Sequence, residues 1–139
     1  MNFNNKVIFI IGNSRSGTTM MSRILGRNKK VHTFQEIHFF ESMFSLNEVH
    51  MPISQKDSIS LLNRLIGIQV EGFYKQDNLQ KYSKESRRII NTIDTLSYSA
   101  LDVYYYFLKY WTEKSHKLIP CEQTPKNLYY LEEIINNFN

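Results

Sequence analysis

The sequence has a single cysteine and no long hydrophobic run. Cys121 is the only cysteine among 139 residues, so an internal disulfide is excluded and a reducing compartment is expected. Nothing in the sequence marks a base that would activate this thiol, which argues against a catalytic cysteine. The N-terminal apolar run, Val7–Ile11, is far too short for a signal peptide or a membrane span, and no later run reaches that length. We therefore predict a cytoplasmic protein without a membrane-spanning segment.

The sequence also lacks a basic stripe. Its 17 Lys and Arg residues exceed its 13 Asp and Glu residues, so the net charge of +4 gives a mild preference for anionic partners. These residues are scattered, and the densest run, Lys81–Arg88, also contains Glu85. Without a basic face that carries interleaved aromatic residues, nucleic-acid binding is not expected. Linkers, repeats and low-complexity segments are also lacking, so residues 1–139 are expected to form a single domain.

The order of apolar and polar segments predicts strands that alternate with helices. Val7–Ile11 is apolar and rich in β-branched residues, as in a strand buried on both faces of a parallel sheet. Ser54 followed by Asp57 has the pattern of a helix-capping box. The complete prediction has strands at Val7–Ile11, Val31–Phe34 and Lys117–Cys121, helices at Gly17–Arg27, Ser54–Ile66, Ile89–Trp111 and Asn127–Phe138, and a polar loop or exposed helix at Asp77–Arg88. This alternation predicts an α/β fold with a mainly parallel sheet.

The segment Gly12–Thr19 joins the first predicted strand to the first predicted helix. A glycine-rich turn at this place forms an anion site, because its backbone N–H groups and the helix N-terminus attract negative charge. The segment follows the pattern G-x-x-x-x-G-K-[ST], except that Thr18 stands where the lysine belongs and a positive charge lies inside the loop at Arg15. Such a loop suits a phosphate or phosphosulfate without a metal ion. The alternatives are a plain strand-to-helix turn and a P-loop nucleoside-phosphate kinase or NTPase, which needs a lysine at position 18 and a Mg²⁺-binding aspartate.

The string Phe9–Met21 closely resembles the opening of sulfotransferases that use 3′-phosphoadenosine 5′-phosphosulfate (PAPS), especially their bacterial and tyrosylprotein-type branches. The resemblance implies a P-loop-type three-layer fold, and a transferase that moves a sulfuryl group from PAPS to a hydroxyl or amine without a metal. It also implies that Arg15 holds the 5′-phosphosulfate, while Ser16, Gly17, Thr18 and Thr19 bind the 5′-phosphate. The whole candidate donor loop is Gly12, Asn13, Ser14, Arg15, Ser16, Gly17, Thr18 and Thr19.

Glu36 is the candidate catalytic base. A carboxylate near the end of a second parallel strand lies on the ligand side of a sheet, where a base is needed. In the tyrosylprotein-type branch, a glutamate at the same distance from the loop arginine removes the proton of the acceptor hydroxyl. His38 is the reserve candidate for this role, and a solvent-facing glutamate without a catalytic role is the alternative.

A further part of the resemblance lies at Cys121–Pro125. The family often has Glu-Lys-Thr-Pro here, and the lysine contacts the sulfuryl group or the bridging oxygen. This sequence has Gln123, which donates a hydrogen bond but carries no charge. In the family, an arginine and a serine that bind the donor's 3′-phosphate follow farther along the chain. We therefore expect a sulfotransferase domain that is truncated at its C-terminus, inactive alone, and left with an uncovered apolar helix face at Leu131, Ile134, Ile135 and Phe138. A truncated anion-binding domain without catalysis is the alternative function.

We place no family motif in the segment from about residue 50 to 110, the part of the family in which acceptor specificity varies. The acceptor is thus expected to be a small molecule, a glycan or a peptide, and the oligomeric state is left open. Residues at this helical spacing more often belong to a core, and the candidate acceptor contacts among them are His50, Tyr74, Tyr104, Tyr105, Tyr106 and Trp111.

Overall fold

The protein is an α/β structure built on a parallel sheet. The computed structural model describes residues 6–75 and 77–138. Its strands are β1 (Ile8–Phe9), β2 (Val31–Thr33) and β3 (Ile119–Glu122), which lie in the order β1-β3-β2 with both pairings parallel. The predicted fold class is confirmed.

The strands are shorter than the apolar pattern predicted. Pairing on β1 continues one residue farther, because the Ile10 N–H donates to the Glu122 carbonyl at 2.8 Å. The predicted burial of Val7–Ile11 on both faces is wrong, since these residues are only half-buried. The reason is that β1 lies at an edge of the sheet that the described residues form.

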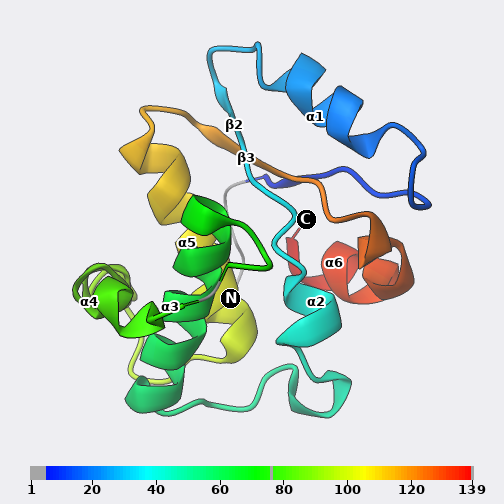
Figure 1. The fold of residues 1–139 in the computed structure, drawn as a ribbon. Coiled ribbons are helices and arrows are strands. Elements are labelled where there is room, and N and C mark those ends of the chain that lie inside the picture. The colour runs from blue at the N-terminus through cyan, green and yellow to red at the C-terminus, as the bar shows by residue number, and fades with distance from the viewer. Residues whose placement is uncertain (1–5, 76, 139) are drawn as a thin grey trace.

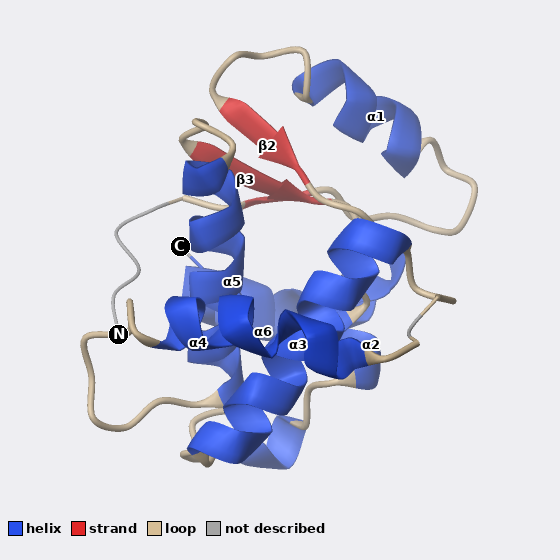
Figure 2. Cartoon of the chain, turned by 60° about the vertical axis from the view of Figure 1, so that its left-hand side comes forward, coloured by secondary structure: helices blue, strands red, loops and turns tan. Residues whose placement is uncertain are grey.

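The helices cover the two faces of the sheet unequally. Helix α1 (Thr18–Leu25) lies alone on one face, and the other helices lie on the opposite face, which gives three layers (Figures 1 and 2). The other helices are α2 (Phe39–Ser42), α3 (Gln55–Glu71), α4 (Ser83–Ile90), α5 (Ala100–Lys114) and α6 (Leu131–Phe138), with 3₁₀ turns η1 (Leu46–Glu48), η2 (Leu79–Tyr82) and η3 (Pro125–Tyr130). Within the described residues, no helix is long and apolar enough to cross a membrane.

Side-chain caps explain where two of the long helices begin. The Ser54 hydroxyl accepts a hydrogen bond from the Asp57 N–H at 3.1 Å, which confirms the predicted start of α3, although this helix runs five residues beyond the predicted end at Ile66. The predicted continuous helix Ile89–Trp111 is wrong. A reciprocal capping box between Ser99 and Asp102 starts α5 afresh, so the chain turns between α4 and α5.

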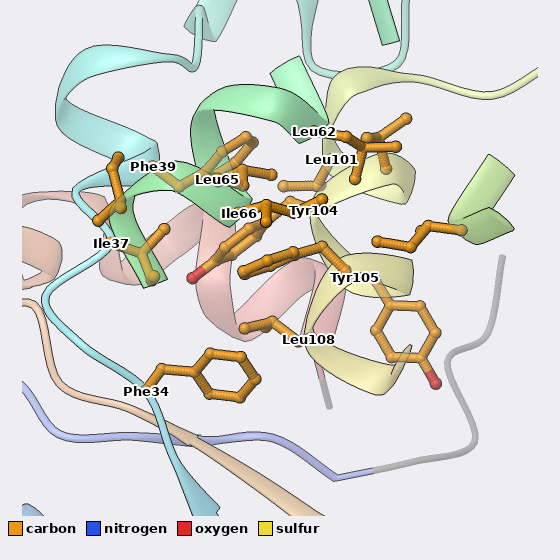
Figure 3. Close-up of a cluster of buried hydrophobic side chains, with 14 of the residues drawn as sticks. Phe34, Ile37, Phe39, Leu62, Leu65, Ile66, Leu101, Tyr104, Tyr105 and Leu108 are labelled. Carbon is orange, nitrogen blue, oxygen red and sulfur yellow. The ribbon is translucent and has the colours of Figure 1, made fainter. Parts of the chain in front are cut away.

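An aromatic core joins the helices beneath the sheet (Figure 3). The rings of Phe39 and Tyr104 stack with centroids 4.0 Å apart, and both side chains are buried. Tyr104 and Tyr105 are therefore core residues and not acceptor contacts, and Tyr106 and Trp111 pack against the same core.

Helix α6 is covered by the chain itself, contrary to the expectation of an open apolar face. Ile134 and Phe138 are buried, and the Phe138 ring lies 5.1 Å from that of Phe9 on β1. Only Ile135 on this helix is a strongly exposed apolar residue. The predicted single helix at Asn127–Phe138 is divided in the structure, because the 3₁₀ turn η3 precedes α6.

Candidate functional site

The loop between β1 and α1 has a backbone shape that suits an anion. Arg15 and Gly17 have φ angles of 64° and 88°, in the left-handed region, and the Ser16 N–H donates to the Asn13 carbonyl at 3.1 Å. No side chain caps α1, so the first-turn N–H groups of this helix are not consumed by a capping side chain. A Cβ atom at Gly12 would lie 2.6 Å from the Ser16 hydroxyl oxygen, so a larger residue there would require the Ser16 side chain to rotate away.

The loop is fixed against the end of β3. The Gly12 N–H donates to the Pro125 carbonyl at 3.4 Å, beyond the end of the strand, and the Phe34 N–H donates to the Cys121 carbonyl at 2.9 Å. The segments that follow all three strands therefore start at one edge of the sheet. In parallel sheets, this carboxyl edge is where ligands bind. The loop residues from Asn13 to Gly17 are exposed at this edge, whereas Thr18 is buried.

Glu36 and His38 follow β2 at the same edge. The Glu36 carboxylate lies 3.6 Å from His38 Nε2, and its side chain keeps 40% of its exposure. On the other side of the ring, His38 Nδ1 lies 3.1 Å from the Glu41 carboxylate. The two predicted base candidates are thus neighbours in one cluster rather than separate sites.

Lys126 completes this cluster from the segment after β3. Its ammonium group is hydrogen-bonded to the Glu41 carboxylate. Lys126 and, secondarily, His38 lower the pKa of Glu41, although partial burial works against them. We name the series Glu36, His38, Glu41 and Lys126 the carboxylate–histidine chain.

A buried carboxylate, Glu122, lies next to the carboxylate–histidine chain. Glu122 is completely buried and accepts hydrogen bonds from the backbone N–H groups of Ile37 (3.4 Å) and Thr124 (3.1 Å), and from the side chains of Thr124 and Asn127. Burial raises the pKa of Glu122, and these hydrogen bonds offset part of the rise. The His38 N–H in turn donates to the Thr124 hydroxyl at 3.1 Å. Glu122 therefore ties the segment after β2 to the segment after β3.

Position 123 has no positive charge, as the sequence indicates. Gln123 is 8% exposed, and its amide oxygen has no hydrogen-bond partner within the described part of the chain. The cation of the carboxylate–histidine chain is instead Lys126, three residues later. An amide at position 123 can donate a hydrogen bond toward a ligand but cannot balance its charge.

Among the candidate acceptor contacts, Tyr74 is an exposed residue beside Phe73, whose ring packs against His38. The Phe73 ring lies 4.5 Å from the His38 ring, and the Tyr74 ring meets Phe73 edge-on at 5.4 Å while remaining 95% exposed. His50 instead lines a cavity of about 250 Å³ with Tyr98 and Asp102, residues that play no part in the carboxylate–histidine chain.

Sequence reasoning missed Glu41, Lys126 and the structural role of Glu122. The spacing of His38 and Glu41, three residues apart on a short helix, is a signal that could have paired them. Glu41 and Lys126 are 85 residues apart, so their contact depends on the packing of α2 against η3. The assignment of the donor loop, of Glu36 and of His38 to chemical roles stays a prediction.

Comparison with known proteins gives a family for the chain. The family model described as "Sulfotransferase family" matches residues 7–138, which is nearly the whole chain. No match is found among the curated proteins or among the solved structures.

Proposed function

The chain belongs to the sulfotransferase family, and from this premise we propose that it transfers a sulfuryl group from PAPS to a hydroxyl or amine acceptor. The observation that carries the proposal is that the loop Gly12–Thr19 and the Glu36–His38 pair both lie at the carboxyl edge of the sheet. A donor held by one and an acceptor deprotonated by the other would meet there.

The donor's phosphosulfate would bind in the loop Gly12–Thr19. The N–H groups at the start of α1 and the Arg15 guanidinium supply hydrogen bonds and positive charge to the anion. Thr18 replaces the lysine of a nucleoside-triphosphate loop, so the loop lacks the side chain that would reach a γ-phosphate.

The acceptor would be activated by Glu36. Its carboxylate takes the proton of the acceptor hydroxyl or amine while that oxygen or nitrogen attacks sulfur. The bond from sulfur to the bridging phosphate oxygen breaks, and adenosine 3′,5′-bisphosphate leaves with the electron pair. Charge builds on the leaving oxygen, where Gln123 would offer a hydrogen bond and Arg15 a positive charge.

A binding experiment tests the donor part of this proposal. Adenosine 3′,5′-bisphosphate should raise the thermal unfolding midpoint of the chain by several degrees at saturating concentration, and ATP with Mg²⁺ should not. A response to ATP with Mg²⁺ but not to the bisphosphate would favour the kinase or NTPase alternative. A response to inorganic phosphate equal to that of the bisphosphate would favour an anion-binding domain without catalysis.

Arg15→Ala should weaken binding of adenosine 3′,5′-bisphosphate by roughly ten- to a hundredfold, because a charge-assisted hydrogen bond contributes about 1.5–3 kcal/mol. Titration calorimetry measures this change. Arg27→Ala is the matched control, since Arg27 is an exposed arginine beyond the end of α1. Equal affinities of the two variants would overturn the assignment of Arg15.

A further inference from the structure

We propose that Glu41 is a positioning residue that fixes the His38 ring with its proton on Nδ1, so that Nε2 can receive the proton that Glu36 takes from the acceptor. This inference rests on the proposed function for its chemistry but not for its geometry. It makes Glu36 and His38 one acid–base unit and assigns roles to Glu41 and Lys126, which sequence reasoning did not reach.

The distances around the imidazole determine the direction of the unit. Each ring nitrogen faces a carboxylate, and an ionised carboxylate only accepts hydrogen bonds. Glu41 lies at hydrogen-bonding distance, 3.1 Å from Nδ1, whereas Glu36 lies at 3.6 Å from Nε2. A neutral ring carries one proton, so the shorter contact places it on Nδ1. The Nε2 lone pair then faces Glu36.

Both the backbone and the ring of His38 are held by contacts with neighbouring residues. Its N–H donates to Thr124, its carbonyl accepts from the Ser42 hydroxyl at 2.7 Å, and its ring packs against Phe73. Its φ angle of 56° lies in the left-handed region, which is costly for a residue with a side chain. Backbone strain maintained by this many contacts is typical of functional positions.

The charged groups around the ring are arranged to accept a proton. Glu36 faces it from the segment after β2, Glu41 from α2, and the buried Glu122 from β3. Lys126, on η3, contacts Glu41 rather than the ring, and it keeps that carboxylate ionised and in place. An imidazolium formed here would lie between two carboxylates.

The proton path is balanced. The acceptor's O–H or N–H bond breaks as its oxygen or nitrogen bonds to sulfur, and the proton moves to Glu36. Glu36 then passes this proton to His38 Nε2 as the contact shortens, which returns Glu36 to its carboxylate form. The product bisphosphate carries away the electron pair of the broken S–O bond, and His38 later releases its proton to water.

The tautomer of His38 is the first test, and it needs no turnover. Long-range ¹H–¹⁵N spectra of the ¹⁵N-labelled chain at a pH where the ring is neutral should show protonated Nδ1 and unprotonated Nε2. In Glu41→Ala the acceptor at Nδ1 is lost, so the proton should move to Nε2, where the Glu36 carboxylate can accept it. Glu48→Ala, on η1, is the control and should leave the spectrum unchanged. An Nε2–H tautomer in the parent chain, or no change in Glu41→Ala, would overturn the proposal.

A double-mutant cycle tests the role in catalysis. With PAPS and a hydroxyl acceptor, Glu41→Ala and His38→Gln should each lower kcat by at least roughly tenfold with little change in the KM for PAPS. Adding Glu41→Ala to His38→Gln should lower kcat no further, because Glu41 acts only through the ring. Additive losses would contradict this route. If the parent chain neither binds adenosine 3′,5′-bisphosphate nor turns over, the proposed function fails, and the tautomer result still decides the role of Glu41.

Discussion

At the scale of the residue, the described part of the site has few positively charged groups at the carboxyl edge of the sheet. The loop contributes Arg15, and the segment after β3 contributes Lys126 instead of a cation at position 123. Lys126 is hydrogen-bonded to Glu41, so it would affect a ligand through Glu41 and His38. Gln123 is buried, and its amide oxygen has no hydrogen-bond partner among the described residues.

Glu36→Gln should leave binding of adenosine 3′,5′-bisphosphate nearly unchanged and lower sulfuryl transfer about a hundredfold or more, which is the usual scale for a lost general base. Calorimetry and transfer of labelled sulfate measure the two effects separately. A loss of binding without a change in kcat would show that Glu36 contacts the donor rather than the acceptor.

Lys126→Met should raise the pKa of Glu41 toward its ordinary value of 4.5, because the hydrogen bond from Lys126 is the largest cause of the depression. A depressed carboxyl pKa stabilises the fold above the unfolded-state value, and this contribution is lost as the pH falls through the folded-state value. The variant should therefore lose less stability than the parent chain as the pH falls below about 4.5. A ¹³C NMR titration of the Glu41 carboxyl measures the pKa directly, and an unchanged value would contradict the ion pair.

At the scale of the element, local patterns predicted what local interactions decide. The run Val7–Ile11 and the glycines after it predicted β1, the loop and α1, and Ser54 with Asp57 predicted the start of α3. The pattern did not predict the turn before α5, because apolar residues continue at helical spacing on both sides of it. Tyr104 shows the same limit, since helical spacing is identical for a residue that faces a core and one that faces a cleft.

The capping box of α5 gives a direct test at this scale. Ser99→Ala should lower the free energy of unfolding by about 0.5–2 kcal/mol, because an N–H group at the start of the helix loses its partner. Ser97→Ala, in the same loop and exposed, should have little effect. Urea unfolding followed by circular dichroism measures both, and equal stabilities would show that the cap does not determine where α5 starts.

At the scale of the whole molecule, the site and the core share their supports. The helix α2 carries Glu41 on its outer side, while Phe39 and Phe40 of the same helix are buried in the aromatic core. Glu122 is buried at the end of β3 and binds the backbone of Ile37, which is itself a core residue. Packing of the core therefore sets the positions of the groups at the carboxyl edge, and sequence patterns that lack the packing cannot give their distances.

Helix α6 closes this core, and Phe138 is its main contact. The Phe138 ring meets Phe9 of β1, Phe40 of α2 and Tyr104 of α5, so one side chain connects the sheet to two helices. Phe138→Ala should lower the free energy of unfolding by about 3–5 kcal/mol, because it leaves a cavity among these rings. Ile135→Ala is the control on the same helix, since Ile135 is 54% exposed and its truncation should cost far less. Denaturant unfolding measures the two changes, with light scattering to detect association. If both variants have the stability of the parent chain, α6 does not pack on this core and its apolar face is open to a partner.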